Sequence, residues 1–173
     1  VAADLRYGPA QMGLDASVVD RRIERVADRL ALTPLLDRSP DRLSGGQMRR
    51  AALASALTVD PDLLLVDEPF ADLDATQRER VREVLDEAVA DGTAVVYATP
   101  DVERAATADR VILLGREGSV AADGPPEAVL TDEELLRTHG LEPPQVVALC
   151  RELGVEDPPV TTEGAVARFE NLL

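Results

Sequence analysis

At 173 residues the chain is long enough to form a sizeable hydrophobic core, and its single cysteine, Cys150, excludes an internal disulfide. The 33 acidic residues outnumber the 18 basic ones, and the net charge of -15 argues against nucleic acid or anionic lipid as a direct partner. No apolar run approaches the roughly 20 residues of a membrane-spanning helix. Cys150 follows an apolar helical pattern and is expected to be a small core residue.

The basic residues of the chain are all arginines. A heavily acidic surface without lysine suits a salt-rich cytosol, in which charge repulsion is screened, and we hold this halophile-like composition as a hypothesis. A GC-rich genome that prefers arginine codons explains the composition equally well. Unfolding measured against salt concentration separates the two explanations, because a protein equally stable in dilute buffer is not halophilic.

Taken in chain order, the first part of the sequence predicts two helices joined by an irregular linker. Apolar residues at helical spacing predict a helix over residues 17–30, and Ser17 can cap its start. Two prolines interrupt residues 33–42, which are expected to form the linker. A second helix, rich in alanine, is expected over about residues 47–57.

Strands and helices alternate in the middle of the chain. Continuous apolar runs at residues 63–66 and 94–98 predict buried parallel strands, and a helical pattern over residues 75–90 lies between them. Residues 110–114 are expected to form another strand, which turns back through residues 119–122 as a hairpin. This alternation predicts an α/β core with a parallel sheet, followed by a helical C-terminal part.

A short segment, Leu43-Ser44-Gly45-Gly46-Gln47, marks the start of the second helix. The two glycines let a phosphate approach the backbone without a clash at Cβ, and free N–H groups at a helix start favour an anion. Ser44 adds a hydroxyl donor. Ser44 and Gln47 also fit an ordinary capping box, so the segment taken alone has a purely structural explanation as well.

Two acidic residues follow the first predicted strand. Asp67 stands at its carboxyl end, where ligand sites of open α/β sheets gather, and a carboxylate there can hold Mg²⁺ through water. Glu68 can orient or deprotonate an attacking water. Because acids are common in this chain, a solvated Asp-Glu-Pro turn is the alternative. The apolar run before the pair and Leu73-Asp74 after it favour the catalytic interpretation.

Together these motifs resemble those of the ABC ATPase superfamily. Residues 43–47 resemble its signature, residues 63–69 its Walker B motif and residues 71–74 its D-loop. More narrowly, residues 4–9 and 138–144 are similar to segments in ATPases of energy-coupling factor importers, which move cobalt, nickel or vitamins. The resemblance implies a P-loop NTPase-like three-layer α/β core with a parallel sheet.

The resemblance also implies three parts of the chain. Residues 1–45 would be a partial α-helical subdomain with its linker. Residues 46–124 would form the C-terminal part of the ABC ATPase α/β core, and residues 125–173 a C-terminal helical extension. The protein would then act at the cytoplasmic face of the cell membrane as a peripheral subunit.

In this family two ATPase subunits sandwich two ATP molecules, so the resemblance implies ATP and Mg²⁺ as cofactors. The implied partners are a second ABC ATPase subunit, in a homo- or heterodimer, and a transmembrane coupling subunit. Asp67 would hold Mg²⁺ through water, Glu68 would be the catalytic base and Asp74 would couple the two sites. The γ-phosphate bound by the other subunit would be contacted in trans by the signature residues Ser44, Gly45, Gly46 and Gln47.

Two departures from the family pattern shape these expectations. The sequence has no Gly-x-x-x-x-Gly-Lys loop (Walker A) and opens with Val1, so we expect a truncated form that is inactive alone. Pro100 stands where the family has its switch histidine, and its side chain neither donates nor accepts a hydrogen bond. The site around Glu68 is therefore expected to be slow or degenerate. The single histidine, His139, is expected at a surface helix end.

Three functions compete on these observations. The favoured one is the ATP-hydrolysing subunit of an energy-coupling factor importer for a metal ion or a vitamin. A non-transport ABC ATPase, such as a DNA-repair factor, usually carries inserted coiled coils or basic linkers, and this sequence shows neither. A non-catalytic partner that donates only its signature motif in trans is supported by Pro100 and by the missing lysine loop.

Overall fold

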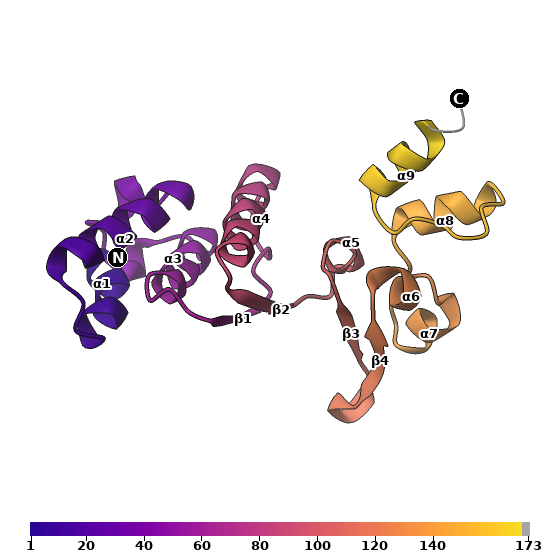
Figure 1. The fold of residues 1–173 in the computed structure, drawn as a ribbon, viewed down its shortest axis with the longest axis horizontal. Coiled ribbons are helices and arrows are strands. Elements are labelled where there is room, and N and C mark those ends of the chain that lie inside the picture. Colours follow the sequence, from indigo (N-terminus) through magenta and orange to yellow (C-terminus); the bar gives the residue numbers. More distant parts are fainter. Residues whose placement is uncertain (171–173) are drawn as a thin grey trace. The chain divides into compact units, whose positions relative to one another are not determined.

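The structure, a computed structural model, describes residues 1–170. The chain forms two compact units, residues 1–98 and the segment from Thr99 onward, and each has its own hydrophobic core (Figure 1). The expected division after residues 45 and 124 follows function rather than compactness and stays a prediction. The last three residues of the predicted C-terminal extension, 171–173, lie outside the part of the chain that the structure describes.

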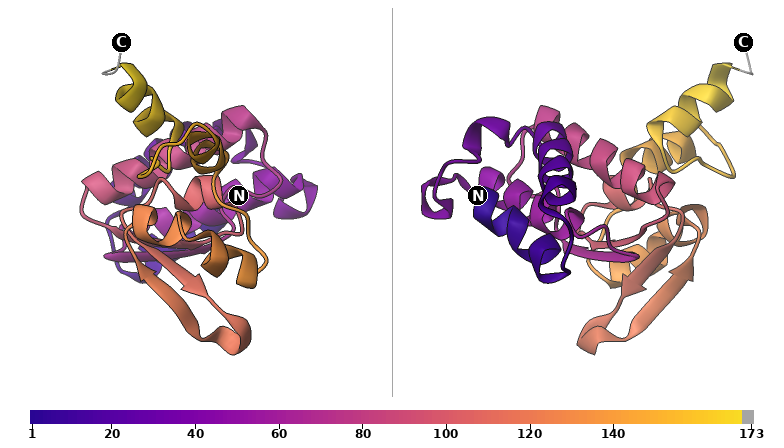
Figure 2. Two further views of the ribbon diagram at one scale, coloured as in Figure 1. Left: turned by 90° about the vertical axis from the view of Figure 1, so that its right-hand side faces the viewer. Right: turned by 60° about the vertical axis from the view of Figure 1, so that its left-hand side comes forward.

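Helices make up the first half of the first unit. The apolar stripe of the expected helix over residues 17–30 is buried in the core of this unit. Ser17 does not cap that helix, because Asp15 occupies the N-cap position one residue before its start. Three helices pack against one another here, α1 (Ala2–Gln11), α2 (Ala16–Arg29) and α3 (Gly45–Leu57) (Figures 1 and 2).

The linker between α2 and α3 is less irregular than its prolines suggest. It contains two single-turn 3₁₀ helices, η1 (Thr33–Leu35) and η2 (Pro40–Arg42), and each has proline in its first turn. Proline is favoured there because its φ angle is already helical and its missing N–H would have no partner. The leucines around η1 are buried, so the linker belongs to the core of the first unit.

A strand–helix–strand segment completes the first unit. β1 (Leu63–Asp67) and β2 (Ala94–Ala98) pair in parallel, from Leu63 opposite Ala94 to Asp67 opposite Ala98, and α4 (Ala75–Ala90) connects them. The predicted bounds of all three elements are confirmed to within one residue. Helix α3 contacts β1 and α4 contacts β2, so the helices cover the face of the sheet that carries Leu64.

The expectation that both strands are buried is wrong. Leu65 is 68% exposed, and Leu63 and Val96 are also mostly exposed, whereas Leu64 is buried. Successive side chains of a strand point to opposite faces, and within residues 1–170 only one face of this sheet is covered by helices. An apolar run of five residues looks the same in the sequence whether one face or both are covered.

The second unit combines a hairpin with short helices. β3 (Val111–Leu114) and β4 (Val120–Gly124) pair antiparallel across the turn η3 (Arg116–Gly118), which confirms the predicted hairpin. They form a sheet separate from β1 and β2. The helices of this unit are α5 (Val102–Ala105), α6 (Pro126–Leu130), α7 (Glu133–Thr138), α8 (Gln145–Glu152) and α9 (Thr162–Glu170).

Two single residues of the second unit lie where they were expected. Cys150 is fully buried on α8, as predicted for a small core residue. His139 is the C-cap residue of α7, and its Nδ1 lies 2.8 Å from the carbonyl oxygen of Leu135. Of the helices within residues 1–170, none is both long enough and apolar enough to cross a bilayer.

Candidate functional site

The start of α3 holds the segment that was singled out for phosphate chemistry. Ser44 is the N-cap residue: its hydroxyl accepts from the amide of Gln47 at 3.3 Å, and its own amide donates to the Gln47 side chain at 3.0 Å. The predicted capping box is therefore present. It fixes the chain direction so that the two glycines form the first turn of the helix, where N–H groups lack intrahelical partners.

The two glycines of this turn have different surroundings. A Cβ atom on Gly46 would lie 3.0 Å from Leu73 Cδ2 and 3.3 Å from the carbonyl oxygen of Asp72, so any larger residue there would press against residues 71–74. A Cβ atom on Gly45 would meet nothing within 4 Å. Packing within the chain thus explains Gly46, whereas Gly45 leaves open space in front of the helix start.

The chain reverses sharply where β1 ends. The amide of Glu68 still donates to the carbonyl of Ala98 at 2.9 Å, but its φ angle is +45°, in the left-handed region. Asp72, four residues on, has a φ angle of +58°. Each such residue costs about 1–2 kcal/mol when it is not glycine, so the surrounding contacts have to hold this turn in place.

The side chains of Asp67 and Glu68 are exposed at this turn, whereas Pro69 and Phe70 behind them are buried. Phe70 packs edge-on against Tyr97 of β2, with ring centroids 5.6 Å apart. The apolar residues thus anchor the turn to the sheet while both carboxylates face solvent. This arrangement confirms the location at a strand end that was predicted for the two acids, and their catalytic roles stay predictions.

Asp74 is the N-cap residue of α4, and its carboxylate accepts from the amide of Gln77 at 2.8 Å. The loop of residues 71–74 therefore lies between two fixed points, the end of β1 and the start of α4. Through the contacts of Gly46 with Leu73 and Asp72, this loop also touches the first turn of α3. The structure consequently brings the segments of Gly46, Glu68 and Asp74 into one corner of the first unit.

Two arginines of α3 donate to backbone carbonyls, and one of them, Arg49, connects α3 to the turn after β1. Arg49 Nη1 donates to the carbonyl oxygen of Glu68 at 3.0 Å, and its Nη2 lies 3.5 Å from Asp72 Oδ2. Arg50, only 7% exposed, donates to the carbonyl of Leu30 at 2.7 Å and to that of Gly46 at 3.4 Å. Burial lowers the pKa of the Arg50 guanidinium.

From the sequence alone, Arg49 and Arg50 can either pair with acids of the helical subdomain or lie on a solvated helix face. Neither describes Arg50, which is buried against carbonyl oxygens. The acid that Arg49 meets lies in the loop after β1. No local pattern signals such contacts, since they join residues about twenty positions apart.

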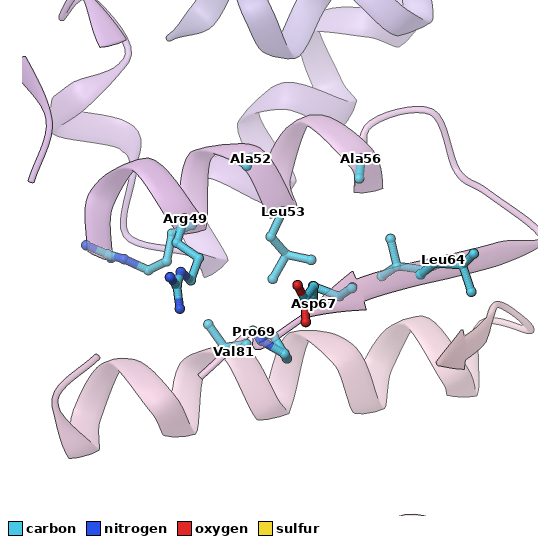
Figure 3. Close-up of a pocket in the computed structure, with 11 residues that line it drawn as sticks. Arg49, Ala52, Leu53, Ala56, Leu64, Asp67, Pro69 and Val81 are labelled. Carbon is cyan, nitrogen blue, oxygen red and sulfur yellow. The ribbon is translucent and has the colours of Figure 1, made fainter. Parts of the chain in front are cut away.

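A small pocket of about 220 Å³ lies between α3 and β1 (Figure 3). Its walls are mostly apolar, and Asp67 and the two arginines add charged groups (Figure 3). Asp67 is thus the one predicted site residue that lines this pocket. The full lining consists of Arg49, Arg50, Ala52, Leu53, Ala56, Leu64, Leu65, Val66, Asp67, Pro69 and Val81.

The acids of this corner do not form a metal cage by themselves. Among the described residues, no cluster of three or more His, Cys, Asp or Glu side chains could hold a metal ion. Mg²⁺ usually keeps several waters and binds one or two carboxylates together with nucleotide phosphates. The exposed carboxylate of Asp67 suits that kind of coordination, so the residues present fit Mg²⁺ held with a nucleotide.

Pro100 lies between β2 and α5 and is exposed. The neighbouring Asp101 caps α5, and its carboxylate accepts from the amides of Glu103 and Arg104 at 3.0 and 3.3 Å. Pro100 belongs to the second unit, whereas Asp67, Glu68 and the signature residues belong to the first. Its expected place beside the reacting phosphate stays a prediction.

Comparison with known proteins identifies related chains. Residues 6–71 match the family model described as ABC transporter. The chain is 42% identical over 150 residues to the cobalt import ATP-binding protein of Rhodobacter capsulatus, covering 86% of this chain and 53% of that protein. It is 34% identical over 173 residues to an energy-coupling factor transporter ATP-binding protein of Halalkalibacterium halodurans, covering 100% of this chain and 61% of the relative. The chain thus spans between half and two thirds of the length of these relatives.

Solved structures agree with the sequence matches. A dimeric post-hydrolysis state of an ATP-binding cassette bound to ADP and Pi aligns with a TM-score of 0.59 and 29% identity, covering 65% of this chain and 49% of that one. The ATP-binding subunit of an ABC transporter aligns with a TM-score of 0.69 and 23% identity, covering 82% and 57%. These likenesses confirm the predicted α/β fold class with a parallel sheet.

Proposed function

We propose that the chain carries part of an ABC transporter ATPase domain and works as the ATP-hydrolysing subunit of an energy-coupling factor importer, because residues 6–71 match the ABC transporter family model and the relatives above carry such names. The solute is a metal ion or a vitamin, and a membrane subunit rather than this chain selects it. The proposal rests on the names of the cobalt-import and energy-coupling factor relatives, and on motifs shared with the superfamily. In this role the protein is a peripheral subunit at the cytoplasmic face of the membrane.

The observation that carries the proposal is the open space at Gly45, next to Gly46, which packs against Asp72 and Leu73. At that place a phosphate can approach the first amides of α3 without meeting a side chain from this chain. The phosphate belongs to an ATP molecule bound by a second ATPase subunit. Ser44, Gly45, Gly46 and Gln47 then act in trans, and the capping box holds their backbone in place beforehand.

The two acids act on the ATP bound by their own subunit. Bound Mg²⁺ would neutralise part of the charge on the phosphoryl group that ATP supplies. Asp67 would hold the ion, through water, and Glu68 would accept a proton from the attacking water. Asp74, fixed as the cap of α4, couples the two sites through the loop that touches Gly46.

A second candidate function is favoured by Pro100. A proline side chain cannot hydrogen-bond to a γ-phosphate or to Glu68, so the site built around Glu68 loses one expected contact. In this alternative the protein donates its signature residues to a partner's ATP and hydrolyses little ATP itself. The two candidates differ in whether Glu68 contributes to turnover.

Substitutions in the native protein, purified from its source cells with its bound partners, distinguish these candidates. We expect a second ABC ATPase subunit and a membrane subunit to copurify. Glu68→Gln should lower ATP hydrolysis about 100-fold or more, because it removes a general base. Gly45→Asp should also lower it, since a carboxylate there repels phosphate, although an acid in the first helical turn stabilises α3.

The pattern of results decides between the readings. Loss of hydrolysis in both variants supports the importer ATPase with a working site at Glu68. Loss in Gly45→Asp alone supports the signature donor. If both variants hydrolyse ATP at the parent rate, the proposal is wrong in both forms. Thermal unfolding of each variant provides the control, and we expect both to unfold within a few degrees of the parent.

A further inference from the structure

We propose that Arg49 is a positioning residue, which holds Glu68 in its left-handed backbone conformation and joins it to the start of α3. This inference rests on the proposed function, because it matters for catalysis only if Glu68 acts on ATP. Arg49 is the second residue after Gln47, and its guanidinium extends from α3 to the turn after β1. Nothing in the residue pattern of this segment assigns it that role.

Arg49 contacts the two residues of this turn that have left-handed backbone conformations. Its Nη1 donates to the carbonyl oxygen of Glu68, which also accepts from the amide of Ala71 at 3.2 Å. Its Nη2 faces the carboxylate of Asp72. Glu68 and Asp72 are the non-glycine residues of this turn with positive φ angles. One guanidinium therefore bridges both ends of the strained segment.

The conformation of Glu68 determines where its carboxylate lies. A change of φ at Glu68 from the left-handed to the ordinary region swings the Cα–Cβ bond relative to the strand that precedes it. The charge-assisted bond from Arg49 to the carbonyl of the same residue opposes that change. Because Gly46 packs on Asp72 and Leu73, the first turn of α3 and the turn at Glu68 are held together from two sides.

The chain contains a matched arrangement at the other end of α3. Arg22 donates to the carbonyl of Thr58 at 3.2 Å and pairs with Asp60 at 3.1 Å, and Asp60 also has a positive φ angle, +61°. The side chains of Arg22 and Arg49 are 22% and 35% exposed. Arg22 thus makes the same two kinds of contact in the same unit, but outside the candidate site.

Amide hydrogen exchange in the native protein tests the local effect. Arg49→Gln should speed exchange of the amides of Glu68 and residues 70–72 about tenfold or more, the size expected for loss of one charge-assisted hydrogen bond. Arg22→Gln should leave these amides at the parent rate and speed exchange near residue 60 instead. Arg49→Lys, which keeps the charge and one donor, should restore most of the protection. Equal exchange of the amides of Glu68 and residues 70–72 in Arg49→Gln and Arg22→Gln would overturn the inference.

ATP hydrolysis by the native complex gives the second measurement. Arg49→Gln should lower kcat several-fold and change KM little, because a displaced Glu68 affects proton transfer more than nucleotide binding. Arg49→Lys should recover part of kcat, and Arg22→Gln should match the parent. Unchanged kcat in Arg49→Gln, with Glu68→Gln inactive, contradicts the positioning role and leaves the proposed function intact. Unchanged kcat in Glu68→Gln counts against a catalytic Glu68, and hydrogen exchange then still decides whether Arg49 holds the turn.

Discussion

Two sets of arginine contacts, one in each compact unit, differ in their burial. In the first unit Arg49 and Arg50 donate to main-chain carbonyls of segments distant in sequence, and Arg50 does so from the interior. In the second unit Arg110 and Asp123 form a bidentate pair across the β3–β4 hairpin, at the surface, with side chains 69% and 35% exposed. Buried donors are costly to remove, whereas exposed pairs contribute little. The comparison indicates that removal of Arg50 destabilises the first unit more than removal of Arg110 destabilises the second.

The largest effect is expected for Arg50→Met. The change keeps most of the side-chain volume but removes the buried donor to the carbonyl of Leu30, so it should lower the free energy of unfolding by about 2–3 kcal/mol. Arg110→Met on the hairpin should leave stability unchanged within error. Denaturant unfolding of both variants measures the contrast, and equal losses would remove the distinction between the units.

The glycine pair should give the next largest effect. Gly46→Ala forces a Cβ atom against Leu73 and the Asp72 carbonyl, and we expect a loss of about 1–2 kcal/mol. Gly45→Ala places its methyl group in open space and should be neutral or stabilising by up to about 1 kcal/mol, since alanine favours helix. Chemical denaturation of the two variants tests this order. A stability loss for Gly45→Ala would show that its surroundings are not open.

Each unit has an aspartate that caps a helix with nearly the same hydrogen-bond length, so this pair allows the two units to be compared. Asp74 caps α4 in the first unit through a 2.8 Å bond, and Asp132 caps α7 in the second through a 2.9 Å bond. Replacement of either by alanine should cost about 1 kcal/mol, as measured by thermal or denaturant unfolding. ATP hydrolysis by the native complex should fall only for Asp74→Ala. A similar fall for Asp132→Ala would show that the second unit also takes part in turnover.

The smallest expected effect concerns Asp123. Its hydrogen bonds with Arg110 lower the pKa of its carboxyl group, and the same pair raises the pKa of Arg110. Because the folded pKa is the lower one, the pair stabilises the fold above the ordinary carboxyl pKa, and the contribution disappears as pH falls through the lowered value. NMR titration should show the Asp123 pKa rising towards its ordinary value in Arg110→Gln. An unchanged pKa would mean that the pair does not persist in solution.

Local sequence patterns predicted the elements around the site well, because periodicity and capping residues act over a few positions. Ser44 and Asp74 set the starts of α3 and α4, and the apolar runs gave β1 and β2. Helix α1 was not predicted. It has little apolar periodicity and contains Pro9, and its burial depends on packing against α2 and α3.

The parts of the site that sequence reasoning missed depend on tertiary structure. The residue type of Glu68 gives no signal for a left-handed turn, whereas Asp72 is of a type that tolerates this conformation. The hydrogen bond from Arg49 to Glu68 joins residues nineteen positions apart, and it can form only when α3 packs beside β1. The roles of Asp67, Glu68 and Asp74 came from the family resemblance, and the substitutions above are designed to test them.

The contact between Phe70 and Tyr97 gives the first unit a spectroscopic reporter of its own. The chain has no tryptophan and two tyrosines, so tyrosine emission is not masked. Tyr7 is 69% exposed on α1, whereas Tyr97 packs against the ring two residues after Glu68. Replacement of Tyr7 by phenylalanine leaves a single fluorophore beside the turn. Its quenching by a soluble agent would then report rearrangements of residues 68–72 in this chain without any attached dye.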